Sequence, residues 1–196
     1  MEGIGSLLLE PSLPDVVSNI FGRGDSPPIV KAVRADLTRQ YEELAFGRIN
    51  SVHGKSKAHG NKLRTYAMLK TDYNIENYLN IILPAHLAQN ISRIRTSSHD
   101  LEIERGRRAK PKSIPAEERW CRHCKALVED EIHFVTVCPL YESYRIELYK
   151  TYRIKQQSHC EKDIFIQLFS SRDAGHILAL GTFLQKAFSK RKSWLY

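Results

Sequence analysis

The sequence predicts a mostly α-helical fold with an embedded CCHC zinc knuckle. Two observations lead to this fold class. Apolar residues recur at steps of three and four over much of the 196 residues, as they do on the buried face of a helix. The motif Cys121-x2-Cys124-x8-His133-x4-Cys138 supplies three thiols and one imidazole at the short spacings of a closed tetrahedral zinc site.

Three segments are expected along the chain. Residues 1–28 look loose because several prolines and glycines interrupt them. Residues 29–113 form a helical segment that ends in a basic linker marked by Pro111 and Pro115. Residues 114–196 hold the zinc-binding module and the C-terminal helices.

The first helical stripe runs from Ile29 to Leu44, with apolar residues at four-, four-, four- and three-residue steps. Such stripes most often face a protein core, and we assign this one no binding role. Residues 51–61, rich in Ser, His and Gly, are expected to form a polar loop.

Further helices are predicted over residues 63–69 and 75–82, the second with Asn74 as its cap. Pro84 is expected to open a helix that is buried through residue 94. Leu101 and Ile103 alternate with the acidic residues at positions 100, 102 and 104, which favours a short strand.

The zinc module is followed by three more apolar stripes, over residues 140–152, 164–169 and 177–188. Each predicts a helix that packs in the core. The last helix leads into a basic end over residues 186–192.

Cys121 and Cys124 bracket a two-residue turn, which lets both sulfurs point at one ion. Zn²⁺ with three thiolates carries a net charge of −1, and Arg122 and Lys125 lie in this turn to offset it. His123 is interpreted as a bystander that faces solvent or a partner.

His133 and Cys138 are five residues apart, about 140° around an ideal helix, so one continuous α-helix cannot present both to a metal. Glu129 or Asp130 is expected to cap a short helix that carries His133. Cys138 then follows that helix, and Pro139 opens the next one.

The alternative for these thiols is ordinary buried cysteines or two disulfides. Disulfides require an oxidising compartment, and the first twenty residues do not resemble a signal peptide. No stretch approaches the length of a membrane span, so we expect no membrane partner and an intracellular location, nuclear or cytoplasmic. Cys160 is left over once the four ligands are assigned.

The chain is basic, with 30 Lys and Arg against 22 Asp and Glu, a net charge of +8 and a pI near 9.3. This balance favours an anionic partner such as RNA or DNA. Seven basic residues in the linker and the knuckle turn are the expected phosphate contacts: Arg105, Arg107, Arg108, Lys110, Lys112, Arg122 and Lys125.

A plain solvated surface is the alternative interpretation of these charges, with one or two of them paired to Glu102 or Glu104. The C-terminal basic end is a further candidate for phosphate contact. Arg93 and Arg95 fall in a helix and are instead expected to brace the fold through Glu or carbonyl partners.

Two segments within about residues 60–150 carry specific patterns. The first reads R-x-S-S-H-x-L-x-I-E-x-G-R from Arg95 to Arg107, and the second is the cysteine and histidine motif with its eight-residue middle spacing. Together they resemble the C-terminal region of non-LTR, LINE-like retrotransposon polyproteins, which follows the reverse transcriptase palm and thumb. Retroviral knuckles are tighter in the middle spacing.

The resemblance implies that this chain is a fragment of such a polyprotein. It implies one structural Zn²⁺ held by Cys121, Cys124, His133 and Cys138. It also implies RNA or DNA as partner, either the element RNA or its target DNA, and packing against a reverse transcriptase thumb domain.

No catalytic constellation accompanies these motifs. A reverse transcriptase needs an adjacent Asp pair for its metal ions, and no Asp-Asp pair occurs in the sequence. Neither polymerase nor endonuclease catalytic domains are therefore expected, and the chain is predicted not to be an enzyme by itself. Its initial methionine fits a gene that begins inside a decayed element.

A second functional hypothesis is a zinc-stapled helical protein–protein interaction module without nucleic-acid binding. In that hypothesis Tyr149 and Tyr152 are exposed and face a protein partner. The salt dependence of binding affinity distinguishes this hypothesis from nucleic-acid binding. Phosphate contacts weaken steeply with added salt, and an apolar protein interface does not.

Overall fold

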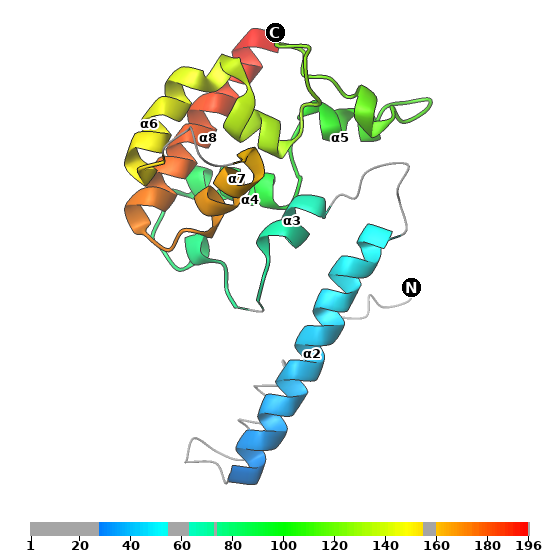
Figure 1. The fold of residues 1–196 in the computed structure, drawn as a ribbon, viewed down its shortest axis with the longest axis vertical. Coiled ribbons are helices and arrows are strands. Elements are labelled where there is room, and N and C mark those ends of the chain that lie inside the picture. The colour runs from blue at the N-terminus through cyan, green and yellow to red at the C-terminus, as the bar shows by residue number, and fades with distance from the viewer. Residues whose placement is uncertain (1–27, 55–62, 73, 155–159, 196) are drawn as a thin grey trace, which may run out of the picture. The chain divides into compact units, whose positions relative to one another are not determined.

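The computed structural model describes residues 28–54, 63–72, 74–154 and 160–195. These residues are mostly helical, as predicted (Figure 1). The strand-like pairing among them is a single isolated antiparallel bridge between Trp120 and Val128. The chain divides into two compact units, Met1–Gly47 and Arg48–Tyr196. No helix in the described part is long and apolar enough to cross a membrane.

Helix α2 spans Pro28–Gly54 and contains the predicted 29–44 helix. It continues through residues 51–54, where a loop was expected; the rest of that loop lies outside the described residues. Arg39 pairs with Glu43 at 3.0 Å one turn away, which supports an exposed helix. The core interpretation of its apolar stripe is wrong, because Val33 and Leu44 are 53% and 64% exposed.

Helices α3 (Arg64–Leu69) and α4 (Ala85–Arg95) confirm two predicted elements, but the helix expected over 75–82 is wrong. That segment holds only the 3-10 turn η1 (Asn77–Leu79). Ile75 and Ile82 are largely exposed, so no packing sustains a longer helix.

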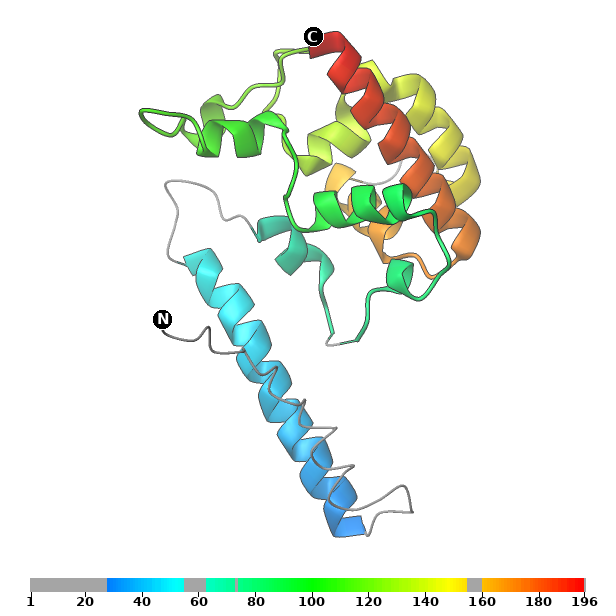
Figure 2. The same ribbon diagram turned by 180° about the vertical axis from the view of Figure 1, so that it is seen from behind.

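The core lies between α4, α6 (Glu142–Tyr152), α7 (Glu161–Ser170) and α8 (Ala174–Leu195). Helix α8 packs against α4, α6 and α7, and Figures 1 and 2 show it running beside α6. These helices confirm the predicted C-terminal stripes. Large side chains fill the space between them and are fully buried: Ile94, Phe134, Phe165, Leu168, Leu180 and Leu184.

The proposed exposure of two tyrosines on α6 is wrong. Tyr149 and Tyr152 are only 5% and 6% exposed. The Tyr152 hydroxyl donates a hydrogen bond to the Leu168 carbonyl at 2.9 Å, and its ring stacks on His176 with 4.2 Å between centroids. Neither tyrosine is therefore available to a protein partner.

Residues 102–107 form the short helix α5 (Glu102–Arg107), so the predicted strand is wrong. Its first turn is acidic and its last turn is basic, the order that the helix dipole favours. Leu101 and Ile103 are both buried, and the backbone N–H groups of Glu104 and Arg105 close the turn onto the Leu101 carbonyl.

The segment after α5 folds back onto it. The Ile114 N–H donates to the Gly106 carbonyl at 2.9 Å, and the 3-10 turn η2 (Ala116–Glu118) follows. Arg119 is buried and donates to the carbonyls of Ile103 and Ile114. The predicted segment boundary near residue 113 falls inside this folded region.

Candidate metal centre

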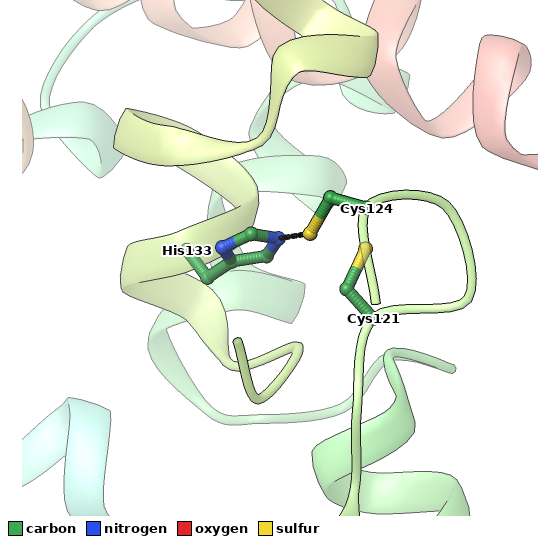
Figure 3. Close-up of side chains that lie close together, drawn as sticks. All are labelled: Cys121, Cys124 and His133. Atoms are coloured by element: carbon green, nitrogen blue, oxygen red, sulfur yellow. Dashed lines mark hydrogen bonds between the residues drawn. The ribbon is translucent and has the colours of Figure 1, made fainter. Parts of the chain in front are cut away.

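The first half of the metal centre is a tight turn at residues 121–124. The Cys121 N–H donates to the Leu127 carbonyl at 2.8 Å, and the Lys125 N–H returns to the Cys121 carbonyl at 2.9 Å. Lys125 takes the left-handed conformation, with φ 55°, that closes the turn. Figure 3 shows both sulfurs on the side of this turn that faces His133.

The second half is the π-helix η3 (His133–Val137). The Asp130 carboxylate accepts the His133 N–H at 2.8 Å, which confirms the predicted cap. The Cys138 N–H then donates to the His133 carbonyl at 2.8 Å, five residues back. This wider turn, rather than the ordinary helix expected, reduces the angular separation of the two ligand positions. Pro139 opens the next turn, η4 (Pro139–Tyr141), as predicted.

Three of the four predicted ligands form one compact cluster. The ligand atoms of Cys121, Cys124 and His133 all lie within 4.8 Å of one another. The Cys124 Sγ is 3.5 Å from the His133 Nε2 (Figure 3). Cys138 lies on the Cys121 side, with 3.9 Å between the two Sγ atoms.

These separations are those of neighbouring ligands in a tetrahedral metal site. Zinc–sulfur bonds of about 2.3 Å and zinc–nitrogen bonds of about 2.0 Å at tetrahedral angles place two sulfurs about 3.8 Å apart and a sulfur and a nitrogen about 3.5 Å apart. Both observed ligand pairs agree with this geometry. The His133 Nδ1 is buried without a hydrogen-bond partner in the described part of the chain, so only Nε2 is directed at the sulfurs.

The two neighbouring thiols have opposed acidities. The contact between the two sulfurs lowers the pKa of Cys121 and raises the pKa of Cys138. Binding of a metal releases the proton that the two thiols share. The thiolate is the form of cysteine that binds metal.

Arg145 lies behind the candidate ligands and supports their backbone, a role that no sequence motif indicated. It is 4% exposed and donates to the carbonyls of Val135 at 2.9 Å and Cys138 at 2.5 Å, so it fixes the backbone that carries the fourth cysteine. The spacing of the sequence could have identified it, because Arg145, Leu148 and Tyr152 repeat at helical steps along the buried face of α6.

A carboxylate network joins the knuckle to the preceding motif. Glu131 accepts hydrogen bonds from Ser97 at 2.7 Å, His99 at 2.8 Å and Arg64 at 2.6 Å. Burial by itself raises the pKa of Glu131, but these donors outweigh it and lower the pKa to about 2. Arg64 also reaches Glu104 at 2.8 Å.

The R-x-S-S-H-x-L-x-I-E-x-G-R segment is therefore mainly internal. Most residues that define the pattern are buried: Arg95, Ser97, His99, Leu101, Ile103, Glu104 and Gly106. Arg95 confirms the predicted bracing role, because it pairs with Glu76 and donates to the Phe169 carbonyl. Arg93, in contrast, is exposed on α4.

Arg191 attaches α8 to this assembly. Its guanidinium makes a two-pronged pair with Glu129, at 2.9 and 2.7 Å, and lies 3.4 Å from Glu102. Although it was placed in the basic end that contacts phosphate, it is 8% exposed. Its spacing from Ala187 and Leu184 continues the buried stripe of α8, which is the signal that identifies it.

The seven predicted phosphate contacts fall into two groups. The four arginines are near acids: Arg105 and Arg122 approach Glu102 at 3.6 and 2.8 Å, Arg107 pairs with Glu104, and Arg108 pairs with Asp100. The three lysines are exposed, and no ion pair involves them within the described residues: Lys110, Lys112 and Lys125.

His123 and Cys160 complete the placement of the predicted residues. The His123 ring contacts Trp194 of α8 edge to face, with 5.2 Å between ring centroids. His123 therefore packs against another part of the same chain. Cys160 is exposed, and its thiol donates to Asp163 at 3.1 Å.

No protein-family model matches this chain, and no curated protein or solved structure matches it either.

Proposed function

We propose that this chain is a nucleic-acid-binding module stapled by one structural zinc ion. The observation that carries the metal assignment is the pair of ligand separations, 3.5 Å for Cys124 to His133 and 3.9 Å for Cys121 to Cys138. Three thiolates with one imidazole form a soft, tetrahedral ligand set that suits zinc.

The proposed role of the ion is structural and not catalytic. Four protein ligands fill the zinc tetrahedron and leave no position for a reactive water. The free energy of metal binding would then stabilise the fold directly, by joining the 121–124 turn to the helix that carries His133.

Nucleic-acid binding is supported by charge and by exposed aromatic side chains. The chain has a net charge of +8, and the exposed lysines 110, 112 and 125 extend from the linker and the knuckle turn. Trp120 is 50% exposed and Trp194 is 44% exposed beside the knuckle. Lysines that contact phosphates together with rings that stack on unpaired bases are the usual means of binding single strands.

The resemblance to non-LTR retrotransposon polyproteins supports a more specific form of this proposal. The chain would be a zinc-dependent fragment of the region after the reverse transcriptase thumb, without polymerase or endonuclease activity of its own. Its partners would be the element RNA or the target DNA, and the thumb domain itself.

The metal part is tested by zinc content. We expect one zinc per chain in the purified protein, a loss of zinc in Cys124→Ser, and no change in Cys160→Ser, which removes an exposed thiol on α7. Unchanged stoichiometry in Cys124→Ser would exclude the site as described.

The nucleic-acid part is tested by titrating salt against binding of a single-stranded RNA. Binding affinity should fall steeply with salt, by about 0.7 log unit per log unit of salt for each phosphate contacted. Lys110→Glu with Lys112→Glu should reduce this slope. Arg107→Glu is a poor substitute, because Arg107 donates to the buried Glu104 at 2.7 Å and its reversal would disturb the fold.

An interaction module remains the second candidate, now through different residues. Trp120, which forms an isolated bridge with Val128, and the 48%-exposed Leu127 next to that bridge offer apolar surface to a protein. One zinc per chain with no binding of RNA or DNA at low salt would favour this candidate.

A further inference from the structure

A hollow of about 630 Å³ lies where α4, α5 and α8 meet. Arg93 from α4, Arg105 from α5, and Arg191 and Lys192 from α8 contribute to its lining. Asp100 is the acidic residue among the described lining residues. We call this hollow the basic groove. Figure 2 shows α4 meeting α8, the two helices that pack against each other.

Glu129 binds Arg191 in a two-pronged pair, and the other acids around the basic groove are shared among more cations than they can neutralise. One oxygen of Glu102 lies within 3.6 Å of three guanidinium groups, at 2.8 Å from Arg122, 3.4 Å from Arg191 and 3.6 Å from Arg105. The Asp100 carboxylate already pairs with Arg108 outside the groove. The groove therefore keeps an excess of positive charge that favours an anion.

Two cations of the groove are available to a ligand. Arg93 and Lys192 are exposed, and no ion pair involves either of them in the described residues. They come from different helices, each fixed by packing in the core. Rigid helices thus hold two accessible cations at one concave surface, in contrast with the lysines of the linker.

The wall of the groove is partly apolar. Phe188 contributes its aromatic side chain, which is held in place by the Phe134 ring at 5.0 Å between centroids. Leu101 also belongs to the lining, but its side chain is buried. A positively charged groove with an aromatic wall is the usual surface for a single strand, whose backbone follows the charges while a base meets the ring. A duplex keeps its bases stacked inside and cannot present one to such a wall.

We propose that the basic groove binds the sugar–phosphate backbone of a single-stranded nucleic acid, with Arg93, Arg105 and Lys192 at the phosphates. This inference rests on the proposed nucleic-acid-binding function and deepens it. It places the main contact on α4 and α8, whereas the sequence pattern placed it on the linker and the knuckle turn.

The test compares two double variants with the same change in net charge. Arg93→Glu with Lys192→Glu alters the groove, and Lys150→Glu with Lys162→Glu alters exposed lysines of α6 and α7. All four side chains are exposed, so both variants should keep the wild-type circular dichroism and zinc content. Binding is measured by fluorescence anisotropy with a short labelled single-stranded RNA over a range of salt concentrations.

The groove variant should lose on the order of tenfold in affinity, and its salt slope should fall by about 1.4, the contribution of two phosphates on a single strand. The control should stay within about twofold of the wild type because its charges lie away from the groove. An excess of uridine monophosphate should fail to displace the RNA, since one phosphate cannot replace several contacts.

Three results would overturn the inference, and they differ in what they leave standing. If the groove variant binds like the wild type, or the control weakens equally, the strand lies elsewhere and the proposed function survives. If the mononucleotide displaces RNA at matched phosphate concentration, the groove is a small-anion site. If the zinc-loaded wild type binds no nucleic acid at all, the proposed function fails as well.

Discussion

Three arginines are buried around the candidate metal centre, where they form internal hydrogen bonds instead of contacting solvent or a ligand. Arg119 and Arg145 donate to backbone carbonyls on the two sides of the knuckle, and Arg191 pairs with Glu129. Burial lowers the pKa of Arg119 and of Arg145, although both guanidiniums keep strong hydrogen-bond partners. Buried arginines are rare without such partners, so Arg119 and Arg145 mark places where backbone carbonyls need a donor, and Arg191 marks a place where a buried carboxylate needs one.

Gly106 is required because of one of these arginines. A Cβ built at Gly106 would lie 2.6 Å from the Cγ of Arg119 and 2.7 Å from its Cδ. Gly106→Ala should therefore displace Arg119 from the Ile103 carbonyl and lower the free energy of unfolding by about 1–3 kcal/mol, despite the better helix propensity of alanine. Urea denaturation measures the change.

Gly175→Ala is the matched control for that substitution. Gly175 is exposed in the first turn of α8, and its added Cβ meets only the Asp173 carboxylate at 3.2 Å. The control should be neutral or slightly stabilising. Equal stability of Gly106→Ala and the wild type would show that the Arg119 contact can relax freely.

At the scale of elements, sequence patterns identified the helices that pack in the core and the exposed helix α2, but they misassigned two short segments. The helix after Pro84 and the three C-terminal helices were predicted correctly, because each buries an apolar face against another helix. The 75–82 helix was wrong because its apolar residues face solvent. The 101–103 strand was wrong because both alternating residues are buried by a helix turn and not by a sheet.

In the candidate metal centre, too, some features were predictable from the local sequence and others were not. The sequence predicted the turn, a cap at either Glu129 or Asp130, and the break before Pro139, since each depends on local chemistry; the structure shows that Asp130 is the cap. The π-turn at His133–Val137 depends on tertiary packing, which no short-range pattern encodes. The expected pairing of basic residues with Glu102 or Glu104 is confirmed for Arg105 and Arg107, but the sequence did not indicate which of the basic residues would make these pairs.

Glu131 joins three of these elements, which leads to a prediction at this scale. Its carboxylate accepts from Arg64 on α3, from Ser97 after α4 and from His99 before α5. Glu131→Gln removes the buried negative charge opposite Arg64, and it should lower the free energy of unfolding by about 3–5 kcal/mol at neutral pH. Thermal or urea denaturation at constant zinc checks this value.

Glu147→Gln removes an exposed carboxylate that pairs with Lys186 on the surface, and it should leave stability unchanged. A similar loss in both variants would mean that general charge balance, and not the buried network, sets the stability. A loss of zinc in Glu131→Gln would instead show that the network positions the adjacent His133.

For the whole molecule, Arg191 makes the metal centre part of the helical core. It ties α8 to Glu129, next to the cap of the His133 helix, while the His123 ring of the knuckle turn contacts Trp194 near the end of α8. Helix α8 in turn packs on α4, α6 and α7. Loss of the metal should therefore lower the stability of the helical core as well as that of the 121–124 turn.

Zinc removal tests this coupling in the intact chain. The two tryptophans of the sequence, Trp120 and Trp194, both lie beside the knuckle, so their fluorescence reports on the turn, while circular dichroism reports on the helices. Chelation should lower the melting temperature by on the order of 10 °C and change both signals in one transition, because the binding free energy of a structural zinc is folding free energy. Cys124→Ser should already show the lower melting temperature and should not respond to the chelator. A fluorescence change without any loss of helix stability would mean that the knuckle folds independently of α8, and that Arg191 does not transmit the metal's contribution to the core.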